Sequence, residues 1–141
     1  MKKIWLGYFS PPLPFAPPNL SPHVIFRGRK IYEPPRYMSI PTAVSQLIDI
    51  ENLRKEEILS PDTTLGIALS RVGGGEESER IVAGTLTDLL TCPIEKFGQP
   101  LHSLVIVGKR LHHLEAEYAQ EYAINRETWS KVARDIYKCT L

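Results

Sequence analysis

Proline is the residue that most restricts how this chain can fold. Nine of its twelve prolines lie between Pro11 and Pro41. Because proline fixes φ and has no backbone N–H to donate, a segment dense in proline is excluded from the interior of helices and sheets. We therefore predict that residues 1–27 form a Pro-rich N-terminal arm and that residues 28–141 form the folded domain. The arm is interpreted as a solvated connector, with a ligand for a proline-recognising domain as the alternative.

The few apolar residues ahead of the prolines do not predict a membrane segment. The run Ile4–Phe9 is shorter than the apolar region of a signal peptide, which needs about 7–15 residues, and is interpreted as a short edge strand. No stretch approaches the roughly 20 apolar residues of a membrane span. Cys92 and Cys139 have no metal-ligand spacing and are expected to be free thiols, with a single bridge as the alternative. The sequence therefore predicts a cytosolic protein.

The charge balance argues against direct binding of nucleic acid. The chain has 17 basic and 16 acidic residues, a net charge of +1, and 43% hydrophobic residues. A protein that binds a phosphate backbone usually has a clustered surplus of basic residues, because its affinity comes from the release of counterions. The composition is instead that of an ordinary soluble domain, and 141 residues suffice for a single hydrophobic core.

Hydrophobic periodicity predicts helices alternating with strands. The clearest helix begins after Ser39, a favourable N-cap, and continues to about Asn52 with apolar residues at helical spacing. Strands are predicted at residues 65–72, 80–84 and 104–107, and further helices at residues 86–90, 111–122 and 126–137. The last helix has an aromatic stripe that includes Trp129, which is interpreted as core or dimer contact. This order of elements predicts an α/β or α+β domain with a mixed sheet flanked by helices.

Three stretches differ from ordinary scaffold in the residues they place together. The first is GRKIYEPPRYMS, residues 28–39, in which two prolines hold an extended segment that presents Arg29, Lys30 and Arg36. A solvated loop before a helix is the alternative. The second is SRVGGG, residues 70–75, where glycines at a strand end would let a ligand approach backbone amides. A plain turn explains this second stretch equally well.

The third stretch, QPLHSLVIVG at residues 99–108, places His102 immediately before a buried strand. A lone histidine is more often a hydrogen-bonded structural residue than a catalyst, and no partner at a recognisable spacing predicts a nucleophilic triad. His112 and His113 begin a helix, but adjacent helical positions point about 100° apart and do not converge on one metal ion. No metal site is predicted.

These three stretches, in this order, resemble the diphthine synthase family. GRKIYEPPRYMS is similar to a long motif of its eukaryotic members, SRVG resembles the family's ARVG strand end, and QPLHSLVIVG resembles its EPLHSLII strand. IVAGTL, residues 81–86, is similar to the family's IAAGTL segment. The likeness extends from Arg27 to Gly108, which is more than half of the chain.

The resemblance implies a fold like the C-terminal domain of tetrapyrrole methylases, in a two-domain enzyme that binds S-adenosylmethionine (SAM) between its domains. The family's SAM contacts in this domain, carried over by motif, are Val72 and His102, acting through backbone groups and packing. The implied reaction is methylation of a modified histidine of translation elongation factor 2 during diphthamide synthesis. Arg29, Lys30 and Arg36 are candidates for contacts with this protein substrate or with the other domain.

The family's N-terminal domain has no counterpart in this sequence, so we expect the chain to be one half of an enzyme and inactive alone. Half of an interdomain cleft leaves apolar surface uncovered, which predicts a homodimer. The alternative function is a non-catalytic dimerisation or partner-binding module that retains the same fold. A methylase of small tetrapyrrole substrates is disfavoured, since GRKIYEPPRYMS is not typical of those enzymes.

Overall fold

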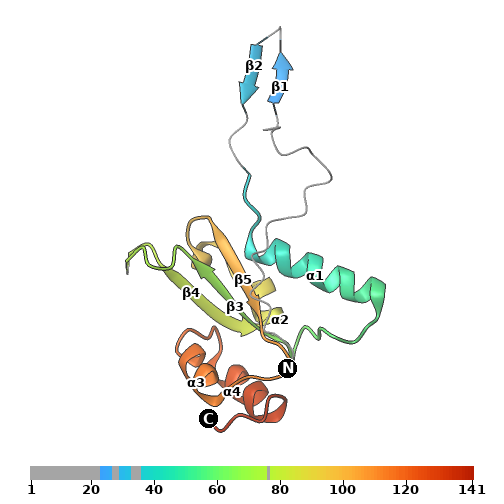
Figure 1. Cartoon of the computed structure of the whole chain (residues 1–141), viewed down its shortest axis with the longest axis vertical. Coiled ribbons are helices and arrows are strands. Elements are labelled where there is room, and N and C mark those ends of the chain that lie inside the picture. Colours follow the sequence, from blue (N-terminus) through green and yellow to red (C-terminus); the bar gives the residue numbers. More distant parts are fainter. Residues whose placement is uncertain (1–22, 27–28, 33–35, 76) are drawn as a thin grey trace.

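The structure of the chain is a computed structural model that describes residues 23–26, 29–32, 36–75 and 77–141. Figure 1 shows its elements in order: β1 (His23–Phe26), β2 (Arg29–Tyr32), α1 (Ile40–Arg54), β3 (Leu65–Ser70), β4 (Arg80–Thr85), α2 (Leu86–Thr91), the 3₁₀ helix η1 (Ile94–Phe97), β5 (His102–Ile106), α3 (His113–Gln120) and α4 (Arg126–Asp135). The predicted strand at Ile4–Phe9 lies outside the described residues. No helix in the described ranges has the length and apolar character that crossing a bilayer requires.

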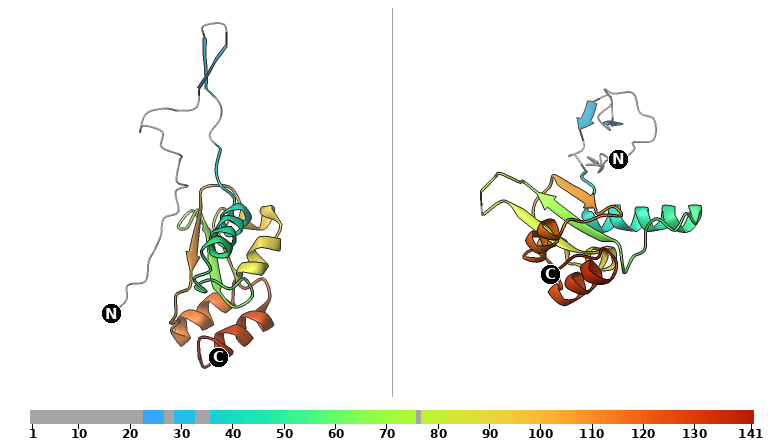
Figure 2. Two further views of the ribbon diagram at one scale, coloured as in Figure 1. Left: turned by 90° about the vertical axis from the view of Figure 1, so that its right-hand side faces the viewer. Right: turned by 60° about the horizontal axis from the view of Figure 1, so that its bottom comes forward.

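The first two strands form a hairpin of their own. β1 pairs with β2 in antiparallel fashion, with His23 opposite Tyr32 and Phe26 opposite Arg29. Figures 1 and 2 show this hairpin apart from the main sheet. Sequence reasoning did not predict the hairpin, and it crosses the predicted boundary between residues 27 and 28, which stays a prediction.

The main sheet has three strands in the order β4-β3-β5, and β3 pairs with both neighbours in antiparallel fashion. The predicted α/β class is confirmed. The described sheet is antiparallel throughout, however, and its parallel component is limited to an isolated bridge between Ala83 and Ala123. A hairpin loop joins β3 to β4, as suits antiparallel neighbours. The segment with α2 and η1 crosses from β4 past β3 to β5, so β4 and β5 run parallel on the two sides of β3.

Helices cover both faces of this sheet. On one side α1, α2 and η1 enclose a core of Ile40, Ala43, Val44, Ala68, Val82, Leu86, Leu89, Cys92, Phe97 and Leu104. On the other side α3 and α4 enclose a core of Leu65, Ala83, Ala119, Trp129 and Val132. Trp129 is fully buried, and its indole nitrogen donates to the Ala116 carbonyl at 3.0 Å. The predicted stripe of the last helix is core at Trp129, Val132 and Ala133, whereas Ile136, which follows the end of α4, is 52% exposed.

Side-chain caps begin all four α-helices of the described residues, and three of these caps were predicted. Ser39 accepts a hydrogen bond from the Thr42 amide, and Asn125 accepts one from the Thr128 amide. Thr85 and Asp88 form a reciprocal capping box at the start of α2. These caps satisfy amides that have no partner within the helix, and they confirm the three predicted start positions.

Helix α3 forms within the predicted residues 111–122, but two of the apolar residues at helical spacing that mark it are not buried. Leu114 and Tyr118 are 59% and 66% exposed. Ala116 and Ala119 are buried in their place. The large indole of Trp129 fills the space between α3 and α4, so only small side chains fit on the α3 surface that faces it.

Candidate functional site

One end of each of the three main strands lies at the same end of the sheet. Ser70, the last residue of β3, is opposite Arg80 of β4 and also opposite His102 of β5. Directly opposed residues of antiparallel strands project from the same face of a sheet. This end of the sheet therefore brings together one residue from each strand. Ser70 and His102 lie opposite each other although they are 32 positions apart in the sequence.

Three side chains hold the turn that leads into β5 against these strand ends. Each donates a hydrogen bond to a different carbonyl of the turn Gly98–Pro100. His102 Nε2 lies 3.0 Å from the Gly98 oxygen, Ser70 Oγ lies 2.6 Å from the Gln99 oxygen, and Arg71 Nε lies 3.2 Å from the Pro100 oxygen. Three successive carbonyls are thereby fixed, which makes this turn a rigid wall.

The contact to Gly98 determines the tautomer of His102. A carbonyl oxygen only accepts, so Nε2 carries the proton and Nδ1 is an acceptor in the neutral ring. Nδ1 is buried and has no hydrogen-bond partner among the described residues. The ring is therefore anchored by one nitrogen, as a structural histidine would be, and its other nitrogen needs a donor that these residues do not supply.

The backbone groups of His102 point away from β3. The Val107 amide donates to the Leu65 carbonyl at 2.9 Å, so these two residues are a hydrogen-bonded pair. Hydrogen-bonded and non-hydrogen-bonded pairs alternate along an antiparallel ladder. The pair Ser70–His102 lies an odd number of steps from Leu65–Val107 and is therefore non-hydrogen-bonded. The N–H and C=O of His102 are therefore directed outward, away from β3.

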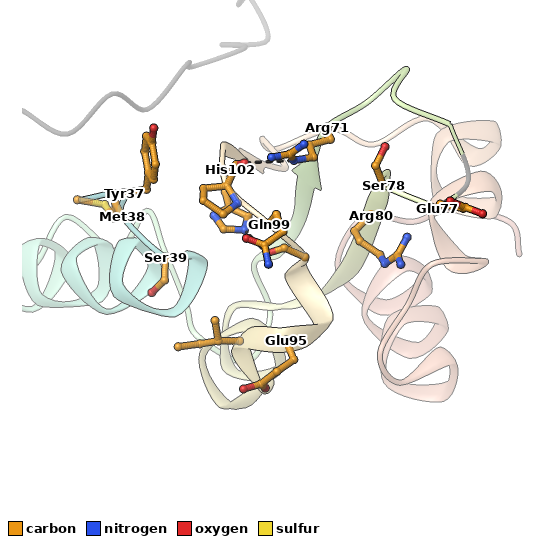
Figure 3. A pocket seen from close by; sticks show the side chains of 13 residues that line it. Tyr37, Met38, Ser39, Arg71, Glu77, Ser78, Arg80, Glu95, Gln99 and His102 are labelled. Atoms are coloured by element: carbon orange, nitrogen blue, oxygen red, sulfur yellow. Dashed lines mark hydrogen bonds between the residues drawn. The ribbon is translucent and has the colours of Figure 1, made fainter. Parts of the chain in front are cut away.

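An open pocket of about 700 Å³ lies against this wall. Its lining comes from the segment before α1, from the two ends of the β3–β4 loop, and from η1 and the turn that follows it (Figure 3). The lining residues are Tyr37, Met38, Ser39, Arg71, Glu77, Ser78, Arg80, Ile94, Glu95, Gly98, Gln99, Pro100 and His102.

The pocket has charges of both signs. Arg71 and Arg80 supply positive charge, and Glu77 and Glu95 supply negative charge. Figure 3 shows Arg71 beside His102, with Arg80 and Glu77 further along the rim. Such a lining suits a ligand that has both an ammonium and a carboxylate group.

Two amides of the glycine-rich loop are already occupied. The Gly73 amide donates to Glu79 Oε2 at 2.7 Å, and the Gly74 amide donates to the Arg71 carbonyl at 2.9 Å. The prediction that glycines here expose amides to a ligand is therefore not met at these two positions. The loop instead needs glycine for its conformation, since φ is +85° at Gly73.

The predicted site residues have different positions relative to the pocket. His102 lines it; Val72 is 63% exposed and is not among the lining residues, whereas its neighbour Arg71 is. Arg36 is exposed, immediately before the lining residue Tyr37. Arg29 and Lys30 belong to β2, where their register partners are Phe26 and Ile25.

The structure adds residues to the site that sequence reasoning missed. Arg71, Arg80 and Gln99 lie within or directly beside the motifs quoted above, but their residue type alone gave no reason to select them. Tyr37 was overlooked although it belongs to the stretch at residues 28–39.

Neither metal nor thiol chemistry is evident in the described ranges. They contain no group of three or more histidine, cysteine, aspartate or glutamate side chains that would hold a metal ion. Cys92 and Cys139 are buried free thiols, as predicted. Burial raises the pKa of both thiols, which keeps them protonated and unreactive at neutral pH. His112, the other candidate metal ligand by residue type, caps α3 through Nδ1.

Comparison with known proteins finds relatives that share one name, diphthine methyl ester synthase. The chain is 42% identical over 111 residues to a diphthine methyl ester synthase of Neurospora crassa, covering 79% of this chain and 37% of that protein. It is 46% identical over 110 residues to the Saccharomyces cerevisiae diphthine methyl ester synthase, covering 77% of this chain and 35% of that protein. The chain thus spans little more than a third of the length of these relatives. No protein-family model matches it.

Solved structures give the same result. A crystal structure of a diphthine synthase from Entamoeba histolytica superposes with a TM-score of 0.57 at 29% identity, over 66% of this chain and 34% of that one. A second diphthine synthase crystal structure superposes with a TM-score of 0.52 at 28% identity, over 70% of this chain. These relatives share the fold of the three-stranded sheet and its helices.

Proposed function

Because this chain belongs to the diphthine synthase family, we propose that residues 28–141 are the C-terminal domain of a SAM-dependent methyltransferase of diphthamide synthesis. Its protein substrate would be translation elongation factor 2, on a modified histidine. The observation that carries this proposal is the 41–46% identity to diphthine methyl ester synthases over about three quarters of the chain. The chain matches just over a third of their length, so we propose that it supplies one wall of the SAM site.

The pocket at the strand ends fits one half of such a site. Its volume, about 700 Å³, is within the range of roughly 300–1,000 Å³ found for small-molecule sites. The methionine part of SAM has an ammonium and a carboxylate, which complement the glutamates and arginines of the lining. An open pocket with no opposite wall would hold such a ligand only weakly.

SAM would supply a methyl group on a sulfonium; an acceptor would attack the methyl carbon in line, and the thioether S-adenosylhomocysteine would be the leaving group. The contribution of the protein is alignment of donor and acceptor. In this chain the turn Gly98–Pro100 provides the rigid surface for that alignment. His102 would contribute its outward-directed backbone groups, since its ring is committed to the Gly98 carbonyl at 3.0 Å.

Val72 would contribute an apolar contact at the same edge. It follows Ser70 by two residues, and Ser70 is the register partner of His102, so the two predicted SAM contacts lie at adjacent strand ends. Arg29, Lys30 and Arg36 remain candidates for contacts with the protein substrate or with the other domain. A homodimer in the cytosol would be consistent with this role.

A chimeric enzyme tests the proposal. The matching segment of the Saccharomyces cerevisiae relative is replaced by residues 28–141 of this chain, and methylation of elongation factor 2 is measured in cells that lack the relative. We expect methylation to be restored. A folded chimera that binds SAM but leaves elongation factor 2 unmodified would overturn the proposed substrate, and a folded chimera without SAM binding would overturn the site.

The unfused chain provides a second measurement. Titration calorimetry of residues 1–141 with SAM is expected to show weak binding or none, because one wall of the site is missing. Micromolar affinity would contradict the proposal that the site needs a second wall.

A further inference from the structure

Arg71 has a backbone conformation that residues with a side chain seldom adopt. Its φ is +50°, in the left-handed region, where glycine is favoured because a Cβ crowds the backbone. Of the described residues other than glycine, four have a positive φ: Lys55, Glu57, Arg71 and Lys138. Lys55 follows the end of α1, which is a usual place for this conformation. Arg71 is the one of the four that directly follows a strand and lines the pocket.

The strain at Arg71 is not explained by a gain in stability. Glycine would adopt this conformation without strain, as Gly73 and Gly75 do in the same loop at φ values of +85° and +83°. The hydrogen bond from Arg71 Nε to the Pro100 carbonyl, at 3.2 Å, lies at an exposed position. Such a bond adds little to stability, because water competes for both of its groups. Strained residues that persist in this way cluster at functional sites.

Arg71 connects the two segments that contain the predicted SAM contacts. Its backbone carbonyl accepts a hydrogen bond from the Gly74 amide at 2.9 Å, which closes a turn that includes Val72. Its guanidinium holds the carbonyl of Pro100, two residues before His102, and Figure 3 shows this hydrogen bond beside His102. One residue thus joins the loop after β3 to the turn before β5.

Ser70 holds the same turn but differs from Arg71 in burial. Its hydroxyl lies 2.6 Å from the Gln99 carbonyl, and the residue is 2% exposed. Loss of a buried hydrogen bond leaves a polar group unpaired away from water, which destabilises the fold. Removal of the Ser70 hydroxyl should therefore lower stability, whereas removal of the exposed Arg71 guanidinium should have little effect on it.

We propose that Arg71 is a positioning residue of the pocket, which fixes the turn at residues 71–74 relative to the turn at residues 98–100. In its left-handed conformation the backbone of Arg71 begins the first turn while its side chain reaches the second. Val72 and His102 then keep one spacing, and a ligand that touches both meets a preformed surface. The identity of this ligand as SAM rests on the proposed function, whereas the positioning is a property of the chain itself.

Arg71→Gly separates positioning from folding, because it relieves the strain and removes the guanidinium. Urea unfolding of the full 141-residue chain is expected to give a midpoint equal to or above that of the wild type. In the chimeric enzyme, the same variant is expected to raise the KM for SAM at least about fivefold and to change kcat less than about twofold. An unchanged KM, or a KM that rises together with a lower unfolding midpoint, would overturn the proposal.

Two controls separate position from strain and from charge. Lys55→Gly is the matched variant, because Lys55 has a φ of +54°, is exposed and is not among the pocket residues. It should relieve similar strain and leave the KM for SAM unchanged. The KM of Arg71→Gly is also measured at about 0.5 M salt, where interactions between exposed charges are largely screened. An increase in KM that disappears at this salt concentration would assign the effect to charge and overturn positioning.

A measurement without SAM distinguishes this proposal from the proposed function. The N–H of Leu101 belongs to the same peptide group as the Pro100 carbonyl, so its order parameter from NMR relaxation reports directly on the contact with Arg71. In the full chain, Arg71→Gly is expected to lower this order parameter from about 0.85 to below about 0.6. Lys55→Gly should leave it unchanged.

The order parameter decides the role of Arg71 whatever the chimera does. An unchanged value for Leu101 in Arg71→Gly would overturn the positioning role. If the value falls as expected and the folded wild-type chimera does not bind SAM, the proposed function is overturned and the positioning role is supported.

Discussion

The buried hydroxyl of Ser70 donates a 2.6 Å hydrogen bond to the Gln99 carbonyl and so ties the turn before β5 to the end of β3. We expect Ser70→Ala to destabilise the chain by about 1–3 kcal/mol, because the Gln99 carbonyl loses its donor at a buried position. Urea unfolding followed by circular dichroism measures the change. Ser130→Ala is the matched control, since Ser130 is on the surface of α4; equal losses for the two variants would contradict this prediction.

Gly98 is expected to tolerate no side chain. Its φ is +72° and its ψ is −166°, a region that is almost restricted to glycine, and a Cβ there would lie 2.9 Å from Arg80 Cγ. We expect Gly98→Ala to cost about 1–3 kcal/mol from backbone strain, with a further loss from the contact. Gly108→Ala is the control, because a Cβ at Gly108 meets open space. Thermal unfolding that gives similar midpoints for both variants would count against the strain.

Removing the steric contact at position 98 separates the two causes of the stability loss in Gly98→Ala, which are the contact and the unfavourable φ. Arg80→Ala in the Gly98→Ala background is expected to recover part of the lost stability, because it relieves the contact but not the unfavourable φ. A double variant that recovers everything would show that strain at φ is negligible. The measurement is a double-mutant cycle on unfolding free energies.

Tyr137 is expected to make the stability depend on alkaline pH. Its hydroxyl accepts a hydrogen bond from the Leu65 amide at 3.3 Å, and burial raises its pKa above the ordinary value of 10.0, against a smaller opposing effect of that hydrogen bond. Because the pKa of Tyr137 is higher in the folded than in the unfolded chain, the folded state is favoured in full while the hydroxyl is protonated, below pH 10.0. This contribution to stability is lost as the pH rises through the folded pKa. We expect Tyr137→Phe to lower stability by about 1 kcal/mol at neutral pH and to reduce the alkaline loss. The measurement is the free energy of unfolding as a function of pH, and curves of the same shape for the variant and the wild type would contradict this prediction.

The two thiols are expected to be hidden in the folded chain. Cys92 and Cys139 are 6% and 7% exposed, and burial raises the pKa of each. A disulfide reagent that reacts with thiolates should therefore label the folded chain at least about tenfold more slowly than the chain in denaturant. Two thiols should be titrated in denaturant without a reductant. Fewer than two would indicate a bridge, and fast labelling before unfolding would show that one site opens readily.

The elements that could be predicted from the sequence are those whose signals are local. Ser39, Thr85 and Asn125 each cap a helix at the predicted position, because a cap depends on residues within one turn of it. The three strands of the main sheet were predicted for the same reason, from apolar runs that end at glycine. Their shared edge was anticipated through the motifs that contain Val72 and His102.

Features that depend on distant residues were missed. The buried face of α3 packs against Trp129 on another helix, so the helical spacing of Leu114 and Tyr118 does not reveal that both side chains are exposed. The β1–β2 hairpin was hidden by the prolines on both sides of it, which favour extended chain. Arg71 and Arg80 enter the site through their positions at strand ends, and exposed arginines are too common in sequences for their type to identify them.

The two edges of the main sheet differ among the described residues, and this difference limits how an assembly built on the sheet can grow. The Ala83 amide and carbonyl at the outer side of β4 are bonded to the segment at residues 122–124, whereas β5 pairs with β3 alone. A unit with a single adhesive side forms a closed pair and then stops, whereas a unit with two such sides polymerises. Accordingly, the chain should be resistant to fibril formation through this sheet even at high concentration.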